Sequence, residues 1–432
     1  MGDTLQQYKD YVMTGFVKAV VPLVVERAKG ATIWDVNGKE YLDCFAGISV
    51  ANAGHCNPMV IEAAKKQMEK LVHCASYIYH AQPVGELAEK LATLTPKGLT
   101  KTFFGNGGAE AIEGALKLSR LYTGKHEFIA LQSSFHGRSF GALSVTGNQA
   151  RKKKGGPYGT GVAFTPAPYV YRSNWPNDPE ECARQCAKAL DDVVKYATSN
   201  DVAAFIAEPV MGEGGIIAPP KNFFQEVKKV LDKYGILFIA DEVQSGFGRT
   251  GKMFAIEYYG VTPDILVAAK GIADGFPLSS FTARPDIAAA YTPGDHLSTF
   301  GGNPVSCAAA LANIEFFEKE KLLAHTVETG NYAMAKLREL QKTNPLIGEV
   351  RGLGLMIGVE LIKDAQKTPA IAEAEALKEA CFQKGVLIGV GGAGNVVRFQ
   401  PPLVITKAQI DQAIGVFAEA LREVAQPAHA TA

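Results

Sequence analysis

The sequence predicts an α/β protein with a mostly parallel central sheet, helices on both faces, and a smaller α+β domain. Short apolar segments recur at 127–131, 202–207, 236–240 and 265–269, and helical periodicity separates several of them. Such alternation is typical of βαβ units, because two parallel neighbours need a long crossover between them. After residue 320 the pattern changes to short strands between helices, which indicates a second unit.

The remaining elements follow in chain order. Residues 5–29 are expected to form a helix and an extended approach, with Pro22 as the break. Residues 31–43 alternate around Asn37 and Gly38, the turn pair that favours a β-hairpin. Helices are then expected at 58–73, 84–95, 179–196, 222–233, 304–319, 326–340, 371–384 and 408–424, and late strands at 354–361, 386–388 and 396–399.

These patterns suggest three ranges. Residues 51–320 are expected to form the large domain, and residues 321–432 most of the smaller one. Residues 1–50 are expected to contribute to the smaller domain, with the hairpin packing against the C-terminal part.

Composition narrows the class of protein. The 432 residues contain 44 Lys+Arg and 44 Asp+Glu, so net charge indicates neither a nucleic acid nor a membrane partner. The basic cluster 151–154 precedes two glycines and is expected to be a solvated, mobile loop. No secretory signal or membrane-length apolar run is visible, and the seven cysteines form no Cys-x-x-Cys pair. We therefore expect a reduced, cytoplasmic protein without a metal site.

Two apolar segments end abruptly in ionisable side chains. The run from Ile236 leads into Asp241, and the run from Ile265 leads into Lys270. Because ligands bind beyond the carboxyl ends of parallel strands, both side chains should reach one rim. Taken singly, Asp241 also fits a helix cap and Lys270 a solvated loop residue. Together, a carboxylate and an amine suit a pyridoxal phosphate enzyme.

Residues 103–118 pass from an apolar strand through a glycine-rich turn into a helix. A helix N-terminus offers unpaired N–H groups and the positive end of a dipole, so it favours a phosphate. No Gly-Lys-Ser/Thr follows, so this turn is not a Walker loop.

The stretch 241–251, Asp-Glu-Val-Gln-Ser-Gly-Phe-Gly-Arg-Thr-Gly, followed by Lys270, resembles the signature of class III (omega) aminotransferases. These are pyridoxal phosphate enzymes of fold type I, and the resemblance extends over about residues 34–421. Within the family the chain looks most similar to 4-aminobutyrate aminotransferases. The resemblance implies that Lys270 holds the cofactor and moves the proton, and that Asp241 pairs with the pyridine nitrogen.

Further cofactor contacts are implied by the same resemblance. Val243 would lie behind the ring, Gln244 would donate to its phenolic oxygen, and Phe135 would stack on its face. His136 would support this packing, and a purely structural histidine is an equally good interpretation.

The phosphate contacts implied by the resemblance lie in two segments. Gly108 and Ala109 match the backbone cradle, although Gly107 and Ala109 lack the hydroxyl that many relatives carry there. Thr299 matches a threonine that reaches the phosphate of the neighbouring subunit. The protein is therefore expected to be a homodimer, with a tetramer as the alternative.

Substrate contacts follow from the resemblance as well. Arg138 would hold the distal carboxylate of an omega-amino acid, and Arg398 the α-carboxylate of 2-oxoglutarate or glutamate. Glu213 would mask Arg398 when the substrate lacks an α-carboxylate, and Glu208 is assigned to the same site. Ile48 stands where ornithine-specific relatives have an aromatic hydroxyl, which favours a plain aliphatic chain. A surface ion pair is the alternative for each arginine.

The expected reaction is ping-pong transamination of an omega-amino acid, best 4-aminobutyrate, with 2-oxoglutarate, giving the semialdehyde and glutamate. Alternatives are acetylornithine, ornithine, taurine or β-alanine as donor with another 2-oxo acid as acceptor, and a class III amino acid racemase or epimerase. A distant alternative is an NAD-dependent dehydrogenase, because residues 389–394 fit Gly-x-Gly-x-x-Gly. The following run, 395–399, reads as a strand instead of a helix, so we interpret the glycines as a turn.

Overall fold

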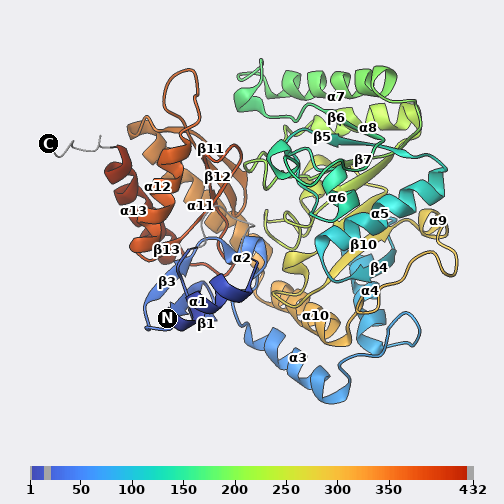
Figure 1. Cartoon of the computed structure of the whole chain (residues 1–432), viewed down its shortest axis with the longest axis horizontal. Helices are drawn as coiled ribbons and strands as arrows, with labels where there is room; N and C mark the ends of the chain where they lie inside the picture. The colour runs from blue at the N-terminus through green and yellow to red at the C-terminus, as the bar shows by residue number, and fades with distance from the viewer. Residues whose placement is uncertain (1, 14–20, 426–432) are drawn as a thin grey trace.

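The computed structural model describes residues 2–13 and 21–425 of the chain. Part of the approach segment predicted at 5–29 therefore lies outside the described residues. The central sheet has seven strands in the order β4-β10-β9-β8-β7-β5-β6. Their bounds are β4 Lys101–Gly105, β5 Glu127–Leu131, β6 Val162–Thr165, β7 Val202–Ala207, β8 Leu237–Asp241, β9 Ile265–Ala268 and β10 Ser279–Ala283. Figure 1 shows strands β4, β5, β6, β7 and β10 of this sheet on the side of the molecule away from α11, α12 and α13.

Strand β10 is antiparallel to both of its neighbours, β4 and β9, and the other pairings in this sheet are parallel. The predicted α/β class with a mostly parallel sheet is confirmed. The carboxyl ends of β4, β5, β7, β8 and β9 consequently lie along one edge of the sheet.

Alternate side chains of the central strands pack into two layers. Phe205 and Phe238 face α8, where the Phe238 ring stacks on Phe224 at 5.4 Å between centroids. Ile206 and Ile239 join the layer that α5 covers on the other face. The helices around this sheet are α3 Pro58–Lys70, α4 Gln82–Leu94, α5 Gly108–Thr123, α6 Phe140–Ser144, α7 Pro179–Tyr196, α8 Phe223–Tyr234, α9 Pro285–Ala288 and α10 Pro304–Lys319.

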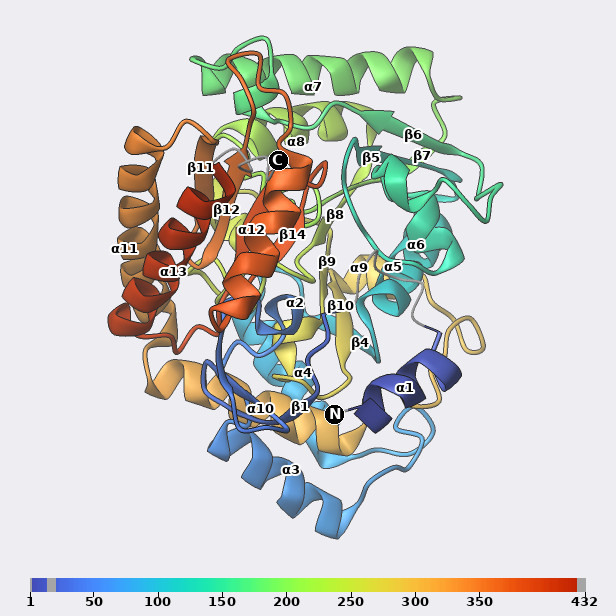
Figure 2. The ribbon, with the colours of Figure 1, turned by 60° about the vertical axis from the view of Figure 1, so that its left-hand side comes forward.

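Two four-stranded sheets lie beside the large one, with the orders β1-β2-β3-β13 and β11-β12-β15-β14. Figure 2 shows α11, α12 and α13 gathered on one side of the molecule, beside β11, β12 and β14. The elements are α1 Gly2–Tyr11, β1 Val25–Lys29, β2 Thr32–Asp35, β3 Glu40–Asp43, α2 Ala46–Ser49, α11 Leu322–Thr343, β11 Ile347–Leu353, β12 Met356–Leu361, α12 Ile371–Gln383, β13 Val386–Leu387, β14 Gly389–Gly391, β15 Val396–Phe399 and α13 Lys407–Ala425.

The predicted hairpin is present, because β2 and β3 pair antiparallel. Strand β13 adds to it in parallel, with Val386 beside Leu42, so the N-terminal hairpin and a C-terminal strand share one sheet. Strands β6, β10, β11 and β14 were missed by the sequence prediction. Within the described ranges, none of the helices has the length and apolar character needed to cross a membrane.

Candidate active site

A cavity of about 430 Å³ opens where the parallel strands end. It brings together most of the residues predicted for the site, while Ile48, Thr299 and Arg398 lie outside its lining. The lining residues are Val50, 106–109, 135–138, Glu208, Glu213, Asp241, Val243, Gln244, Ala269, Lys270 and 275–278.

Asp241 is the last residue of β8, and its carboxylate is fixed by two contacts. Oδ2 lies 2.7 Å from Nδ1 of His136, and Oδ1 accepts a hydrogen bond from the backbone N–H of Val243 at 3.0 Å. Both Asp241 and His136 are buried, with 3% exposure each. In the described part of the chain, Nε2 of His136 has no hydrogen-bond partner. The histidine therefore orients the carboxylate, which is a more specific contact than the packing role predicted from sequence.

Lys270 follows β9 and has a positive φ of 49°, which is uncommon for a residue with a side chain. Burial lowers the pKa of its amine, and the negative charges of Asp241, Glu208 and Glu213 act in the opposite direction. The net shift of the pKa is downward, so a larger fraction of the amine is neutral and nucleophilic at moderate pH than in a free lysine.

The first turn of α5 faces the cavity. Gly107 precedes it, and among the described residues no side chain caps this N-terminus. A Cβ built on Gly107 would meet no atom of the described chain within 4 Å, whereas one on Gly108 would lie 2.9 Å from Cγ1 of Val243. A Cβ on Gly137 would lie 2.7 Å from that of Ala109. Small residues thus keep the backbone N–H groups close to the cavity, as an anion site requires.

The loop with Thr299 is tied to the same turn. Ser298 donates to Oε1 of Glu110 at 2.5 Å, and Asn106 donates to Oε2 through its backbone N–H at 2.7 Å. Burial acts to raise the pKa of Glu110, but these hydrogen bonds outweigh it and lower the pKa. Thr299 itself is exposed and does not line the cavity of its own chain.

Glu208 follows β7 and braces two neighbouring loops. Its carboxylate accepts hydrogen bonds from the backbone N–H of Phe135 at 2.9 Å and of Gly212 at 2.8 Å. Burial raises its pKa to about 7, with Asp241 adding to the shift and His136 opposing it. In this structure Glu208 is a cavity residue engaged with the backbone.

Glu213 connects two arginines. Its Oε2 lies 3.3 Å from Nη1 of Arg398 on β15, and its Oε1 accepts a hydrogen bond from Nη2 of Arg151. Burial acts to raise the pKa of Glu213, but Arg398 and Arg151 outweigh it and lower the pKa. The prediction that residues 151–154 form only a solvated loop is wrong for Arg151. Its partner lies 62 positions along the chain, so sequence proximity could not reveal the contact.

Arg398 occupies a pocket formed partly by the glycine-rich run 389–394. A Cβ on Gly391 would lie 3.0 Å from Nε of Arg398, and Gly392 donates its N–H to the backbone oxygen of Glu213 at 2.9 Å. The first part of the run is strand β14 and the rest is a turn, followed by β15. The glycines make room for the arginine, which explains them without a dinucleotide.

Two other predicted substrate residues are placed differently. Arg138 lines the cavity, with its guanidinium carbon 5.5 Å from the centroid of the Phe135 ring. Ile48 is 43% exposed and lies in a left-handed turn, because residues 46–49 all have positive φ. Asp43 stabilises the start of this turn by accepting the N–H groups of residues 45 and 46 at 2.8 and 2.9 Å. Val50, not Ile48, reaches the cavity of the same chain.

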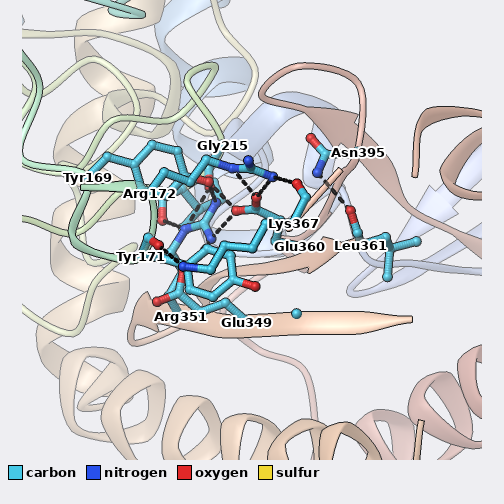
Figure 3. Close-up of polar contacts among 12 residues, drawn as sticks. Tyr169, Tyr171, Arg172, Gly215, Glu349, Arg351, Glu360, Leu361, Lys367 and Asn395 are labelled. Atoms are coloured by element: carbon cyan, nitrogen blue, oxygen red, sulfur yellow. Dashed lines mark hydrogen bonds and ion pairs between the residues drawn. The ribbon is translucent and has the colours of Figure 1, made fainter. Parts of the chain in front are cut away.

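A dense polar cluster supports the loop that carries Glu213 (Figure 3). Arg351 on β11 donates to the backbone oxygen of Gly215 at 2.6 Å and to Oε2 of Glu360 at 2.6 Å. Arg172 donates to Oε1 of Glu360, also at 2.6 Å, and Tyr169 donates to the same carboxylate. Glu360 is fully buried, with 0% exposure. The cluster joins β11 and β12 to segments that follow β6 and β7.

These residues fit pyridoxal phosphate. The cavity presents an amine with a lowered pKa on Lys270, a hydrogen-bonded carboxylate on Asp241, and an uncapped helix N-terminus lined by glycines. An aldehyde, a pyridine nitrogen and a phosphate each have a partner of matching chemistry.

Comparison with known proteins gives the class. Residues 16–421 match the family model for aminotransferase class-III, so this chain belongs to that family. It is a pyridoxal phosphate-dependent aminotransferase of the fold type I architecture.

Three relatives illustrate the range of the family. The chain is 39% identical to the acetylornithine aminotransferase of Methanothermobacter thermautotrophicus, covering 98% of this chain and 99% of that protein. It is also 39% identical to the leucine/methionine racemase of Thermococcus litoralis, covering 93% and 91%. The structure of a thermostable (S)-enantioselective omega-transaminase from Thermomicrobium roseum superimposes with a TM-score of 0.92 at 35% identity, covering 98% and 99%. The acetylornithine alternative is thereby favoured over the 4-aminobutyrate expectation.

Proposed function

We propose that this enzyme transfers the terminal amino group of an omega-amino acid to 2-oxoglutarate, with N-acetylornithine as the donor of choice. The observation that carries the proposal is the pair formed by the buried Arg398 and the half-buried Glu213, which lines the cavity. An arginine that pairs with an internal carboxylate can accept substrates with and without a carboxylate on the reacting carbon. The similarity to acetylornithine aminotransferases supports this donor, ahead of 4-aminobutyrate, β-alanine and taurine.

Lys270 and Asp241 are the proposed catalytic residues. When bound, the cofactor withdraws electrons from the substrate carbon that loses its proton, through a protonated pyridine ring. Lys270 would hold the cofactor through its amine and, once released, move a proton between substrate carbon and cofactor carbon. The lowered pKa of Lys270 suits both tasks. Asp241, oriented by His136, would keep the pyridine nitrogen protonated.

The remaining contacts are proposed from the lining of the cavity. Val243 and Phe135 would enclose the ring from its two faces, and Gln244 would donate to its phenolic oxygen. The N–H groups of Gly108 and Ala109, at the start of α5, would bind the phosphate.

Thr299 would complete the phosphate site of a neighbouring subunit in a homodimer. Thr299 is exposed outside the cavity of its own chain, and its neighbour Ser298 is hydrogen-bonded to Glu110 in the first turn of α5, which supports this arrangement. We expect a dimer or a tetramer built from such dimers.

Arg138 and Arg398 would divide the carboxylates of the substrates. Arg138, exposed at the cavity, would bind the distal carboxylate of the donor, while Glu213 remains with Arg398. The α-carboxylate of 2-oxoglutarate would then displace Glu213 from Arg398. Each half of the ping-pong cycle would use the same cavity.

A racemase or epimerase is the second candidate, supported by the similarity to a leucine/methionine racemase. Lys270 and Asp241 would have the same roles in racemisation, because removing and returning a proton at the α-carbon needs no 2-oxo acid to accept the amino group. This candidate would require the α-carboxylate to occupy Arg398 in every turnover.

The deciding experiment mixes the cofactor-loaded protein with N-acetylornithine alone and follows the visible absorption of the cofactor. We expect the absorption to change to that of the amino form, and 2-oxoglutarate to restore it. The same test with 4-aminobutyrate ranks the two donors. An unchanged spectrum with both donors, together with interconversion of the enantiomers of an α-amino acid on chiral chromatography, would establish the racemase alternative.

A further inference from the structure

Glu213 has two arginine partners that come from different elements of the fold. Arg398 lies on β15, and Arg151 ends the short helix at Gln149–Arg151. Each guanidinium meets a different oxygen of the carboxylate, Oε2 for Arg398 and Oε1 for Arg151. One glutamate is therefore shared between two positive charges.

The two contacts are unequal. The Arg398 pair spans 3.3 Å, and within the described ranges neither Nε nor Nη1 of Arg398 makes a hydrogen bond. Arg151, in contrast, donates a direct hydrogen bond to Glu213. The side chain of Arg398 is 6% exposed, that of Glu213 13% and that of Arg151 33%. Arg151 leaves one buried donor, Nε, without a partner among the described residues, whereas Arg398 leaves two. The more buried arginine therefore has more donors to offer to a second carboxylate.

Arg151 is held in place by the backbone around it. Asn148 caps the short helix by accepting the N–H of Ala150 at 3.1 Å, and its own N–H donates to the backbone oxygen of Ser134 at 2.9 Å. Lys152 lies over the Phe164 ring at 4.1 Å from the centroid. The position of Arg151 is thus tied to the segment that continues into the cavity lining at 135–138.

We propose that Arg151 is a positioning residue that receives Glu213 when a substrate carboxylate takes Arg398. This inference rests on the proposed function, in which 2-oxoglutarate displaces Glu213 from Arg398. Separating a buried carboxylate from its partner costs several kcal/mol unless another charge compensates it. With Arg151 already hydrogen-bonded, Glu213 can leave Arg398 without becoming an isolated charge. Arg151 thereby makes the α-carboxylate site available.

The proposal predicts a selective effect of Arg151→Gln. The Michaelis constant for 2-oxoglutarate should rise about tenfold, which corresponds to about 1.4 kcal/mol. The constant for N-acetylornithine in the other half-reaction should stay within about twofold, because Glu213 then remains on Arg398. Arg151→Lys keeps the charge and should recover most of the affinity for 2-oxoglutarate. Both constants are obtained from single-turnover changes in cofactor absorption.

A binding measurement removes the chemistry. Glutarate carries the two carboxylates of 2-oxoglutarate without the carbonyl, and its dissociation constant for the loaded enzyme can be measured by calorimetry. We expect Arg151→Gln to weaken glutarate binding by about the same tenfold. Lys153→Gln removes a charge from an exposed neighbour on the same loop and should leave glutarate binding unchanged.

The decisive control is to test Arg151→Gln in a protein that already carries Glu213→Gln. In that variant no carboxylate needs to be moved, so adding Arg151→Gln should no longer weaken glutarate binding. A loss that persists there, or a parallel loss for N-acetylornithine, would overturn the proposal. If the wild type fails to react with any omega-amino donor but the glutarate results hold, the proposed function fails and the role of Arg151 stands. Melting curves of Arg151→Gln and Glu213→Gln show whether either variant is unfolded. If Arg151→Gln does not fold, Arg151→Lys is compared with the wild type instead.

Discussion

Two arginine–glutamate clusters meet the same loop, residues 213–216, and they differ in how completely their charges are satisfied. In the cluster around Glu360, the carboxylate is fully buried and accepts hydrogen bonds from Arg351, Arg172 and Tyr169 (Figure 3). In the other, Glu213 is shared between two arginines, and in the described part of the chain both keep buried donors without hydrogen bonds, namely Nε and Nη1 of Arg398 and Nε of Arg151.

The difference separates support from function. A buried ionic group is tolerated when its geometry is good and further hydrogen bonds complete it, and the Glu360 cluster meets both conditions. Arg351 alone donates to the backbone oxygens of Gly215 and Ile216 as well as to Glu360. This cluster fixes the loop in space. The incomplete cluster, carried by the same loop, is the one that can exchange an internal carboxylate for that of a substrate.

Glu208 provides a third case on the same segment. It is a buried glutamate that accepts hydrogen bonds from two backbone N–H groups, and burial raises its pKa to about 7. The pKa values of Glu360 and Glu213 are lowered, because their arginines outweigh the effect of burial. Among these three glutamates, the two with arginine contacts have a lowered pKa, and Glu208 has a raised one.

Arg351→Met should produce the largest loss of stability. It leaves Glu360 with fewer partners in a buried site and releases the Gly215 backbone, so the free energy of unfolding should fall by about 4 kcal/mol. Urea unfolding of the loaded enzyme measures the change. Lys342→Met, which removes an ion pair exposed at 66% and 69%, should cost less than about 1 kcal/mol. Equal, small losses in both variants would show that the Glu360 cluster is not the stabilising one.

Glu208→Gln should remove a pH dependence of intermediate size. The folded protein binds the Glu208 proton more tightly than the unfolded chain, because the pKa is raised to about 7. This contribution favours folding below the ordinary glutamate pKa of about 4.3 and is lost as pH rises to about 7. The stability difference between wild type and variant should therefore change by about 3 kcal/mol across that window. Urea midpoints at several pH values test this, with exposed Glu339→Gln as the control, and a constant difference would contradict it.

Much of this arrangement could be predicted from sequence, because the strongest signals are local. Asp241 and Lys270 end apolar strands, and the carboxyl-end rule for parallel sheets was sufficient to bring them to one rim. The α5 turn followed from its glycines in the same way. Each of these signals lies within a few residues of the side chain that it places.

The parts that escaped prediction depend on distant partners. Strand β10 contains serine and threonine and looks polar, yet it is wholly buried between β4 and β9. Arg151 looked solvated beside three lysines, and its role depends on a glutamate on another loop. The positive φ values at 46–49 arise from tertiary contacts, because an isolated chain disfavours several left-handed residues in succession. Composition and periodicity do not indicate contacts between residues that are distant in the sequence.

Arg398→Gln should change stability least, by less than about 1 kcal/mol, while strongly impairing the reaction with 2-oxoglutarate. Burial lowers the pKa of Arg398, which means that its charge is costly in this position, and Glu213 retains Arg151 when Arg398 is removed. Loss of a charge-assisted contact to the α-carboxylate should reduce kcat/KM for 2-oxoglutarate about a hundredfold. Single-turnover kinetics and urea unfolding on the same preparation measure both effects. A loss of stability as large as that of Arg351→Met would mean that the two clusters do not differ in kind, because Arg398 would then be a structural residue like Arg351.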